Sequence, residues 1–440
     1  MAKIVPLYGV RYNTEKSGNM SDLVTPPYDV IDDQQQQLYY TKSPYNVIRL
    51  ELGKTNSCDD DEDNCYTRAR GFLQYWLQAD ILRHETESAV YYYEQGFSLA
   101  GKRLTRSGLI AGLCLEEYST GQVLPHEETL SRAKEDRLQL LRHGRANFSP
   151  IFGLYEDSGM KAAEIVAKYK KRKADVSFTD EQKETHRLWV INSREDITRL
   201  QEFFQEKKVF IADGHHRYET ALTFHKERLA QGDNRYGFCL ATLVNLYDPG
   251  LVILPTHRLL KNVSNFDRSA FLAALSALFD LQAIPCGEAK PAVLLPRLLE
   301  ENRKQANSAH AYLLYLGDGH FYRLTIPRGK ENKIIQSRYG TRSKEWRSLD
   351  VAVFQGLVLE ETLDISSQDL AEGKYLLYTR GEAEALADVD ENKVQAAFFL
   401  NPTRVEEVIS VAAAGEKMPQ KSTYFYPKLI TGLVINDFRT

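Results

Sequence analysis

Cysteine is scarce in this chain of 440 residues, and long apolar runs are missing. The five cysteines are too few and too scattered for a disulfide framework. No window approaches 18 consecutive apolar residues, so the sequence predicts no membrane-spanning helix and no membrane partner. The opening residues, MAKIVPLYGVRYN, lack an apolar run before a small-residue cleavage site. We therefore expect no secretory signal and a cytoplasmic protein.

A basic excess is also missing, because 56 Lys and Arg residues face 60 Asp and Glu residues and the net charge is -4. Dedicated nucleic-acid-binding proteins usually carry a strong basic excess, so this balance argues against a nucleic-acid partner. The hydrophobic fraction of 43% and the charged fraction of 26% are typical of a globular protein with a real core.

Strand-like and helix-like segments alternate from residue 188 onward. Short apolar runs at 188–192, 209–212 and 238–246 predict strands, and helical spacing at 195–205 and 218–229 predicts helices between them. This rhythm predicts an α/β core, or a mixed α+β one. Because no flexible linker is evident, we expect one fused unit.

Three regions are expected within that unit. They are residues 1–120 with the PPYDVI motif, residues 121–262 with the LPHEET and ADGHHRYETAL motifs, and residues 263–440.

The sharpest motif is the turn from Val209 to Leu222, VFIADGHHRYETAL. An apolar strand ends, Asp213 and Gly214 make a turn, and His215, His216 and Arg217 open a helix. A helix N-terminus attracts anions, and an arginine fork matches phosphate oxygens. Asp213 could instead be a simple helix cap and each histidine a core residue. All four polar groups on one turn nevertheless favour an anion-binding site.

Two other clusters carry candidate groups. LPHEETL and the charged stretch after it offer Glu127 as an acid–base group and Arg137 as an anion clamp, although a surface helix laced with ion pairs has the same composition. The C-terminal stretch MPQKSTYFYPK has the residue types of a phosphate site, Lys421 among them, but lacks the glycines of a Walker loop. An aromatic-rich strand is the alternative there.

Metal-binding motifs are absent from the sequence. Two adjacent histidines, His215 and His216, do not readily ligate one ion, and no HExxH spacing occurs. Pairing of one of them with His126 or His257 stays open. We predict no zinc site, and favour Mg²⁺ held by Asp213 together with a substrate phosphate.

The motifs VTPPYDVI, SPYNVIRLELG, LPHEETL, IADGHHRYETAL and MPQKSTYFYPKLITGLVIN resemble the domain-of-unknown-function family 1015 (DUF1015). The Asp-Gly-x-His-Arg turn is also similar to the phosphate-binding turn of the ParB/sulfiredoxin fold, which includes sulfiredoxin, CTP-binding partition proteins and free-serine kinases. His215 stands where sulfiredoxin has its reactive cysteine, which argues against sulfinic-acid reduction. The resemblance implies a ParB/sulfiredoxin-like core with elaborate N- and C-terminal additions.

The same resemblance implies roles for individual residues. His215, His216 and Arg217 would bind phosphate, and Asp213 would orient a substrate hydroxyl or a magnesium ion. A carboxylate from elsewhere, Glu127 or Asp29, would take the hydroxyl proton.

The preferred hypothesis is a small-molecule phosphotransferase, kinase-like, with free serine as a candidate substrate and a nucleotide or pyrophosphate as donor. The alternatives are a nucleotide-binding regulator without catalysis, and a phosphate- or metal-dependent hydrolase built on the histidines. The sequence does not give the oligomeric state.

Overall fold

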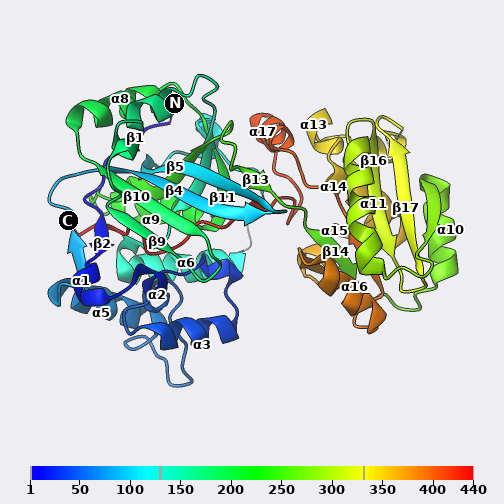
Figure 1. Cartoon of the computed structure of the whole chain (residues 1–440), viewed down its shortest axis with the longest axis horizontal. Helices are drawn as coiled ribbons and strands as arrows, with labels where there is room; N and C mark the ends of the chain where they lie inside the picture. Colours follow the sequence, from blue (N-terminus) through cyan, green and yellow to red (C-terminus); the bar gives the residue numbers. More distant parts are fainter. Residues whose placement is uncertain (1, 128–130, 331, 440) are drawn as a thin grey trace. The chain divides into compact units, whose positions relative to one another are not determined.

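The computed structural model describes residues 2–127, 131–330 and 332–439 (Figure 1). The chain forms two compact units. The first consists of Met1–Pro125, Thr129–Val252 and Pro427–Thr440, and the second of His126–Glu128 and Ile253–Tyr426. The C-terminal residues therefore return to the unit in which the chain begins.

A nine-stranded sheet forms the centre of the first unit, in the order β6-β11-β8-β12-β5-β4-β10-β9 with β1 paired to β5. Its strands are β1 (Ile4–Val5), β4 (Val90–Leu99), β5 (Lys102–Cys114), β6 (Val123–Leu124), β8 (Ile151–Tyr155), β9 (Val176–Thr179), β10 (Thr185–Ile191), β11 (Val209–Asp213) and β12 (Phe238–Asn245). Most pairs are antiparallel, and only β6 with β11 and β8 with β12 run parallel among the described pairs. β5 pairs with β12, so the sheet contains strands from both sides of the predicted boundary at residue 120.

Helices α8 (Arg194–Phe204) and α9 (His215–Leu229) pack on this sheet because each has an apolar face. Leu200, Phe204, Tyr218 and Phe224 are buried in one core with the strand residue Leu243. The other helices and short strands of this unit are α1 (Thr14–Ser17), α2 (Met20–Leu23), α3 (Asp33–Lys42), α4 (Ile48–Glu51), α5 (Cys65–Gln78), α6 (Ser131–Gly144), α7 (Lys161–Val166), η1 (Tyr28–Val30), η2 (Tyr118–Thr120), η3 (Tyr169–Lys171), β2 (Val10–Tyr12), β3 (Leu82–His84), β7 (Ala146–Asn147) and β21 (Asn436–Asp437).

The second unit has its own six-stranded antiparallel sheet, in the order β15-β17-β16-β19-β14-β18. Its strands are β14 (His257–Leu260), β15 (Asp280–Pro285), β16 (Ala309–Tyr315), β17 (His320–Pro327), β18 (Leu376–Thr379) and β19 (Ala396–Phe399). β16 and β17 form a hairpin around Gly317 and Gly319, which both adopt positive φ. The remaining short strands are β13 (Val252–Ile253) and β20 (Phe425–Tyr426).

The helices of the second unit are α10 (Arg268–Leu278), α11 (Pro291–Gln305), α12 (Asn332–Tyr339), α13 (Lys344–Arg347), α14 (Asp350–Phe354), α15 (Ser367–Ala371), α16 (Glu382–Asp390) and α17 (Val405–Ala413). α14 continues into a π-helix, η4, at Gln355–Thr362. Both units combine sheets with helices, so the predicted mixed α/β class is confirmed. Among the described residues, no helix has the length and apolar character needed to cross a membrane.

Candidate functional site

The predicted strand–turn–helix at residues 209–229 forms as expected from its local sequence. The apolar strand β11 is buried between β6 and β8 and ends at Asp213. Gly214 has φ 87° and ψ 29°, a left-handed conformation that favours glycine, and α9 begins at His215. Gly214 precedes the helix without a side-chain cap, so a ligand can approach the first turn of α9.

Asp213 holds two cations at this turn. One carboxylate oxygen, Oδ1, accepts a hydrogen bond from Lys428 Nζ, and Oδ2 lies 3.0 Å from Arg217 Nη2. The three side chains are only 12–16% exposed, so solvent screens their charges weakly. One carboxylate therefore contacts two cations at the positive end of a helix dipole.

Arg217 folds back over the turn. Its Nη1 donates to the carbonyl of Pro150, and a Cβ on Gly214 would lie 3.0 Å from its guanidinium carbon. Its Nε is buried and has no hydrogen-bond partner among the described residues. This close approach explains why glycine is required at position 214 for space as well as for torsion.

The cations also set the ionisation of Asp213. Burial raises its pKa, but the attraction of Lys428 and Arg217 is larger, and the pKa lies well below its usual range. Asp213 is therefore a carboxylate at neutral pH and orients both cations. Both of its oxygens already face cations, which argues against a magnesium ion bound directly to this carboxylate.

Arg137, predicted as an anion clamp, lies in the same unit but is already paired. Its Nη1 donates to the carbonyl of Glu51 at 2.8 Å, its Nη2 lies 2.6 Å from Asp136 Oδ2, and its guanidinium carbon lies 3.9 Å from the centre of the Tyr28 ring. Arg137 and Arg217 line one cavity of about 40 Å³. Arg137 thus has two acidic partners, Glu51 and Asp136, whereas Arg217 contacts Asp213, which it shares with Lys428.

The remaining predicted residues lie elsewhere. Asp29 is exposed on η1, in the PPYDVI motif of the first unit. Glu127 and Lys421 belong to the second unit, where the Glu127 carboxylate accepts a hydrogen bond of 2.9 Å from the Lys421 backbone N–H. His215 is buried and His216 is half-buried at the start of α9. The roles of all these residues stay predictions.

Comparison with known proteins identifies the family. A family described as "Protein of unknown function (DUF1015)" matches residues 4–352. The chain belongs to the DUF1015 family. The predicted membership is thus confirmed, and the C-terminal motif with Lys428 lies beyond the matched range. None of the curated proteins matches this DUF1015 chain.

Several solved structures are distantly similar to this DUF1015 protein. A conserved hypothetical protein from Pyrococcus furiosus is 16% identical, with a TM-score of 0.33 over 74% of this chain and 95% of that one. A free serine kinase variant in complex with ADP is 15% identical, with a TM-score of 0.34 over 74% and 92% of the two chains. SbnI from Staphylococcus aureus is 11% identical, with a TM-score of 0.34 over 74% and 87%.

The histidines considered for a metal-dependent hydrolase make ordinary hydrogen bonds where the DUF1015 structure describes them. His126 Nε2 lies 2.8 Å from the Thr423 hydroxyl. His257 Nδ1 accepts from the Leu400 N–H at 3.3 Å, and burial lowers its pKa to about 3. His257 is therefore a neutral core histidine.

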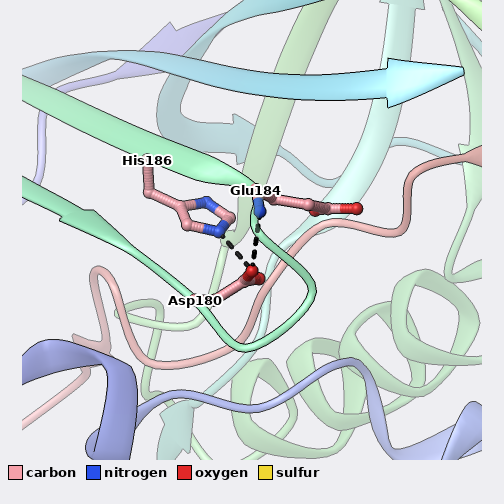
Figure 2. Close-up of side chains that lie close together, drawn as sticks. All are labelled: Asp180, Glu184 and His186. Carbon is pink, nitrogen blue, oxygen red and sulfur yellow. Dashed lines mark hydrogen bonds and ion pairs between the residues drawn. The ribbon is translucent and has the colours of Figure 1, made fainter. Parts of the chain in front are cut away.

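A different trio brings potential metal ligands together (Figure 2). Within the described ranges, Asp180, Glu184 and His186 are the one group of three whose ligand atoms all lie within 4.8 Å of one another. His186 Nε2 lies 3.1 Å from Asp180 Oδ2, and its Nδ1 lies 2.7 Å from the Tyr93 hydroxyl. Figure 2 shows Glu184 extending away from the Asp180–His186 pair. Protein partners occupy both ring nitrogens, so this trio is explained as a buried hydrogen-bond network.

The sequence analysis missed the importance of Lys428 and Glu51. Lys428 was noted only as part of a phosphate-like composition, although it directly contacts Asp213. Glu51 is 2% exposed and accepts hydrogen bonds from Arg137 and from the Ser149 hydroxyl at 2.8 Å. The available signal was a glutamate within the apolar run VIRLELG, because a charge in such a run needs a buried partner.

Proposed function

We propose that the turn before α9 binds the phosphate groups of a nucleotide or pyrophosphate, and that the protein is a kinase-like phosphotransferase acting on a small hydroxyl compound. The observation that carries the proposal is the convergence of Arg217 and Lys428 on Asp213 at an uncapped helix N-terminus. The two cations attract an anion, and the helix dipole adds to that attraction.

Phosphoryl transfer requires mainly positioning and charge neutralisation, which these residues supply. In the proposed step, the substrate hydroxyl oxygen forms a bond to phosphorus while the bond to the leaving oxygen of the donor breaks. The hydroxyl proton passes to a carboxylate, for which Asp29 of the same unit is the candidate. Asp213 acts as a positioning residue, because its oxygens fix Lys428 and Arg217 in place.

The resemblance of Asp213–Arg217 to the turn of free-serine kinases makes L-serine the first substrate to test. Labelled ATP, ADP or pyrophosphate is incubated with the protein and with a panel of hydroxyl metabolites that includes serine. We expect transfer of label to one of them. If a well-folded protein transfers phosphate from none of these donors, the phosphotransferase is excluded, and nucleotide binding without turnover would favour a regulator.

Binding is tested separately by titration calorimetry with ADP, ATP and pyrophosphate. We expect Lys428→Met and Arg217→Met to weaken binding at least ten-fold. Arg235→Met is the matched control, because Arg235 also pairs with an aspartate of the first unit, Asp233, but is 52% exposed and outside the turn. Equal affinities of wild type and the two turn variants would contradict the proposal.

A further inference from the structure

The second unit contains a cavity of about 180 Å³ whose lining is basic and aromatic. Arg258, Arg342 and Lys417 contribute cations to it, and no acidic side chain lines it among the described residues. Met418, Pro419 and Gln420 also line it, so the first half of the C-terminal motif forms one wall. The phosphate-binding turn plays no part in this cavity, since all its lining residues belong to the second unit.

Arg258 is the decisive residue in this cavity. It lies on β14 and is only 5% exposed. Its Nη1 donates to the carbonyl of Thr256 and its Nη2 to the carbonyl of Lys421 at 3.2 Å, so both partners are neutral. No described carboxylate oxygen lies within 4 Å of its guanidinium. A buried cation without a counter-ion is costly, and an anionic ligand group would offset that cost.

The groups around Arg258 do not neutralise its charge completely. Burial lowers the pKa of Arg258, and attraction to Tyr378, Tyr312 and Glu127 opposes the change only in part. The Glu127 carboxylate, which also accepts a hydrogen bond from the backbone N–H of Lys421, attracts Arg258 without lying within 4 Å of its guanidinium. Arg258 is thus left facing the cavity with a charge that neutral hydrogen bonds stabilise incompletely.

The other walls suit a flat apolar group. Trp346 is 4% exposed, and its Nε1 donates to the carbonyl of Lys417 at 2.9 Å, which fixes the indole plane. The Arg342 guanidinium carbon lies 5.1 Å from the centre of the Trp346 ring. The π-helix η4 contributes Gln355 and Leu359 to the lining. π-Helices are rare and frequently occur at functional sites, so this distortion is a second indication of a ligand.

We propose that this cavity binds a small aromatic anion, with one carboxylate or phosphate group against Arg258 and a single ring against the aromatic walls. The size agrees, because a dry cavity of about 150 Å³ accepts benzene, and the additional volume here accommodates one anionic group. This site would bind a second ligand in addition to the phosphate groups proposed for the turn, and it does not depend on phosphate binding there.

The test uses phenylacetate as the probe, measured by titration calorimetry and by the fluorescence of Trp346 in the full-length protein. Phenylacetamide has the same ring without the charge, and phenyl phosphate distinguishes the two kinds of anionic group. We expect phenylacetate or phenyl phosphate to bind at least ten-fold more tightly than phenylacetamide. We also expect Trp346→Phe to remove the fluorescence change, since the other tryptophans, Trp76 and Trp189, lie in the first unit.

Variants locate the probe within the unit. Arg258→Met is expected to lower affinity at least ten-fold, and Arg342→Gln, at the more exposed edge of the cavity, several-fold with the fold intact. Arg323→Met is the matched control, because Arg323 is also largely buried but pairs with Glu301 outside the cavity. The proposal is overturned if neither anion binds at millimolar concentration, if phenylacetamide binds equally well, or if Arg258→Met and Arg342→Gln both retain wild-type affinity.

Discussion

Two buried arginines of this protein have opposite electrostatic surroundings. Arg217, at the turn before α9, lies 3.0 Å from Asp213, and Lys428 contacts the same carboxylate. Arg258, in the cavity of the second unit, has carbonyl partners and no described carboxylate within 4 Å. The first arginine is part of a preorganised ion cluster, while the second is a buried charge that no described carboxylate contacts.

The difference has consequences for stability and for binding. Removing one member of a buried ion cluster leaves its partners uncompensated and is costly. Replacing an uncompensated charge with an apolar side chain of similar volume relieves a desolvation cost. The turn should therefore be sensitive to substitution even without ligand, whereas Arg258 should matter mainly when a ligand is bound.

The largest effect is expected for Asp213→Ala, because this change removes the carboxylate that contacts both Lys428 and Arg217. We expect a loss of about 3–5 kcal/mol in the free energy of unfolding, measured by urea denaturation. Asp233→Ala is the matched control, since Asp233 also pairs with two arginines, Arg228 and Arg235, of which the latter is 52% exposed. A loss for Asp213→Ala no larger than that of the control would contradict the buried ion cluster.

The same carboxylate gives a pH signature. Because the folded-state pKa of Asp213 is lowered, its stabilising contribution is complete above the ordinary pKa of an aspartate and is lost as the pH falls through the lowered value. The difference in stability between wild type and Asp213→Asn should therefore shrink in acid. A difference that stays constant from neutral pH down to about pH 2 would show that Asp213 is not ionised in the way described.

The second prediction compares the two arginines directly. Arg217→Met should cost about 2 kcal/mol, because Asp213 keeps Lys428 but loses a charged hydrogen bond. Arg258→Met should cost less than this in the absence of ligand, since it removes hydrogen bonds to two neutral carbonyls but breaks no ion pair. Chemical denaturation of the two variants in the same buffer measures both values. If Arg258→Met lost more stability than Arg217→Met, the described difference between the two arginines would be wrong.

The local sequence was sufficient to predict the turn before α9 but not the distant residues that contact it. An apolar run, a glycine and helical spacing predict the strand, turn and helix at 209–229 because each signal lies within a few residues. The Asp213–Lys428 contact joins residues 215 positions apart, and the Arg137–Glu51 contact joins residues 86 apart. No local pattern encodes which distant charges meet, so neither the neutralisation of Arg137 nor the role of Lys428 could be derived.

The fold shows the same division between local and distant information. Alternating strands and helices correctly indicate a mixed α/β protein, but alternation does not specify which strands become neighbours. β11 pairs with β6 and β8, so neither β10 nor β12, its neighbours in sequence within the sheet, lies beside it. The helix α14 continues directly into the π-helix η4, a change of helix type that no local sequence pattern marks. Tertiary packing decides both features.

The third prediction separates two reasons for glycine at position 214. Gly214→Ala introduces a Cβ at positive φ and 3.0 Å from the Arg217 guanidinium, so it should cost about 2 kcal/mol. Gly232→Ala is the control, because its φ of 80° is similar and an added Cβ would meet nothing within 4 Å. Its cost should be about 1 kcal/mol, from torsion alone. Equal losses in thermal denaturation would mean that Arg217 does not pack tightly over the turn.

The smallest effect concerns Glu184, which is the acidic counterpart of Arg258. It is 4% exposed, its Oε2 accepts from Gln95 at 2.8 Å, and no described cation lies within 4 Å of it. Burial raises its pKa to about 7, with a further contribution from Asp180. A carboxyl whose pKa is raised on folding destabilises the folded state as the pH rises from the pKa of the unfolded chain toward the pKa of the folded protein.

Glu184→Gln retains the acceptor for Gln95 without the charge, so it should stabilise the protein by about 1 kcal/mol at pH 8 and by less at pH 5. Thermal denaturation at the two pH values measures this difference, and Glu181→Gln, on the same turn but exposed, should show none of it. Destabilisation by Glu184→Gln at pH 8 would instead mean that Glu184 has a cationic partner.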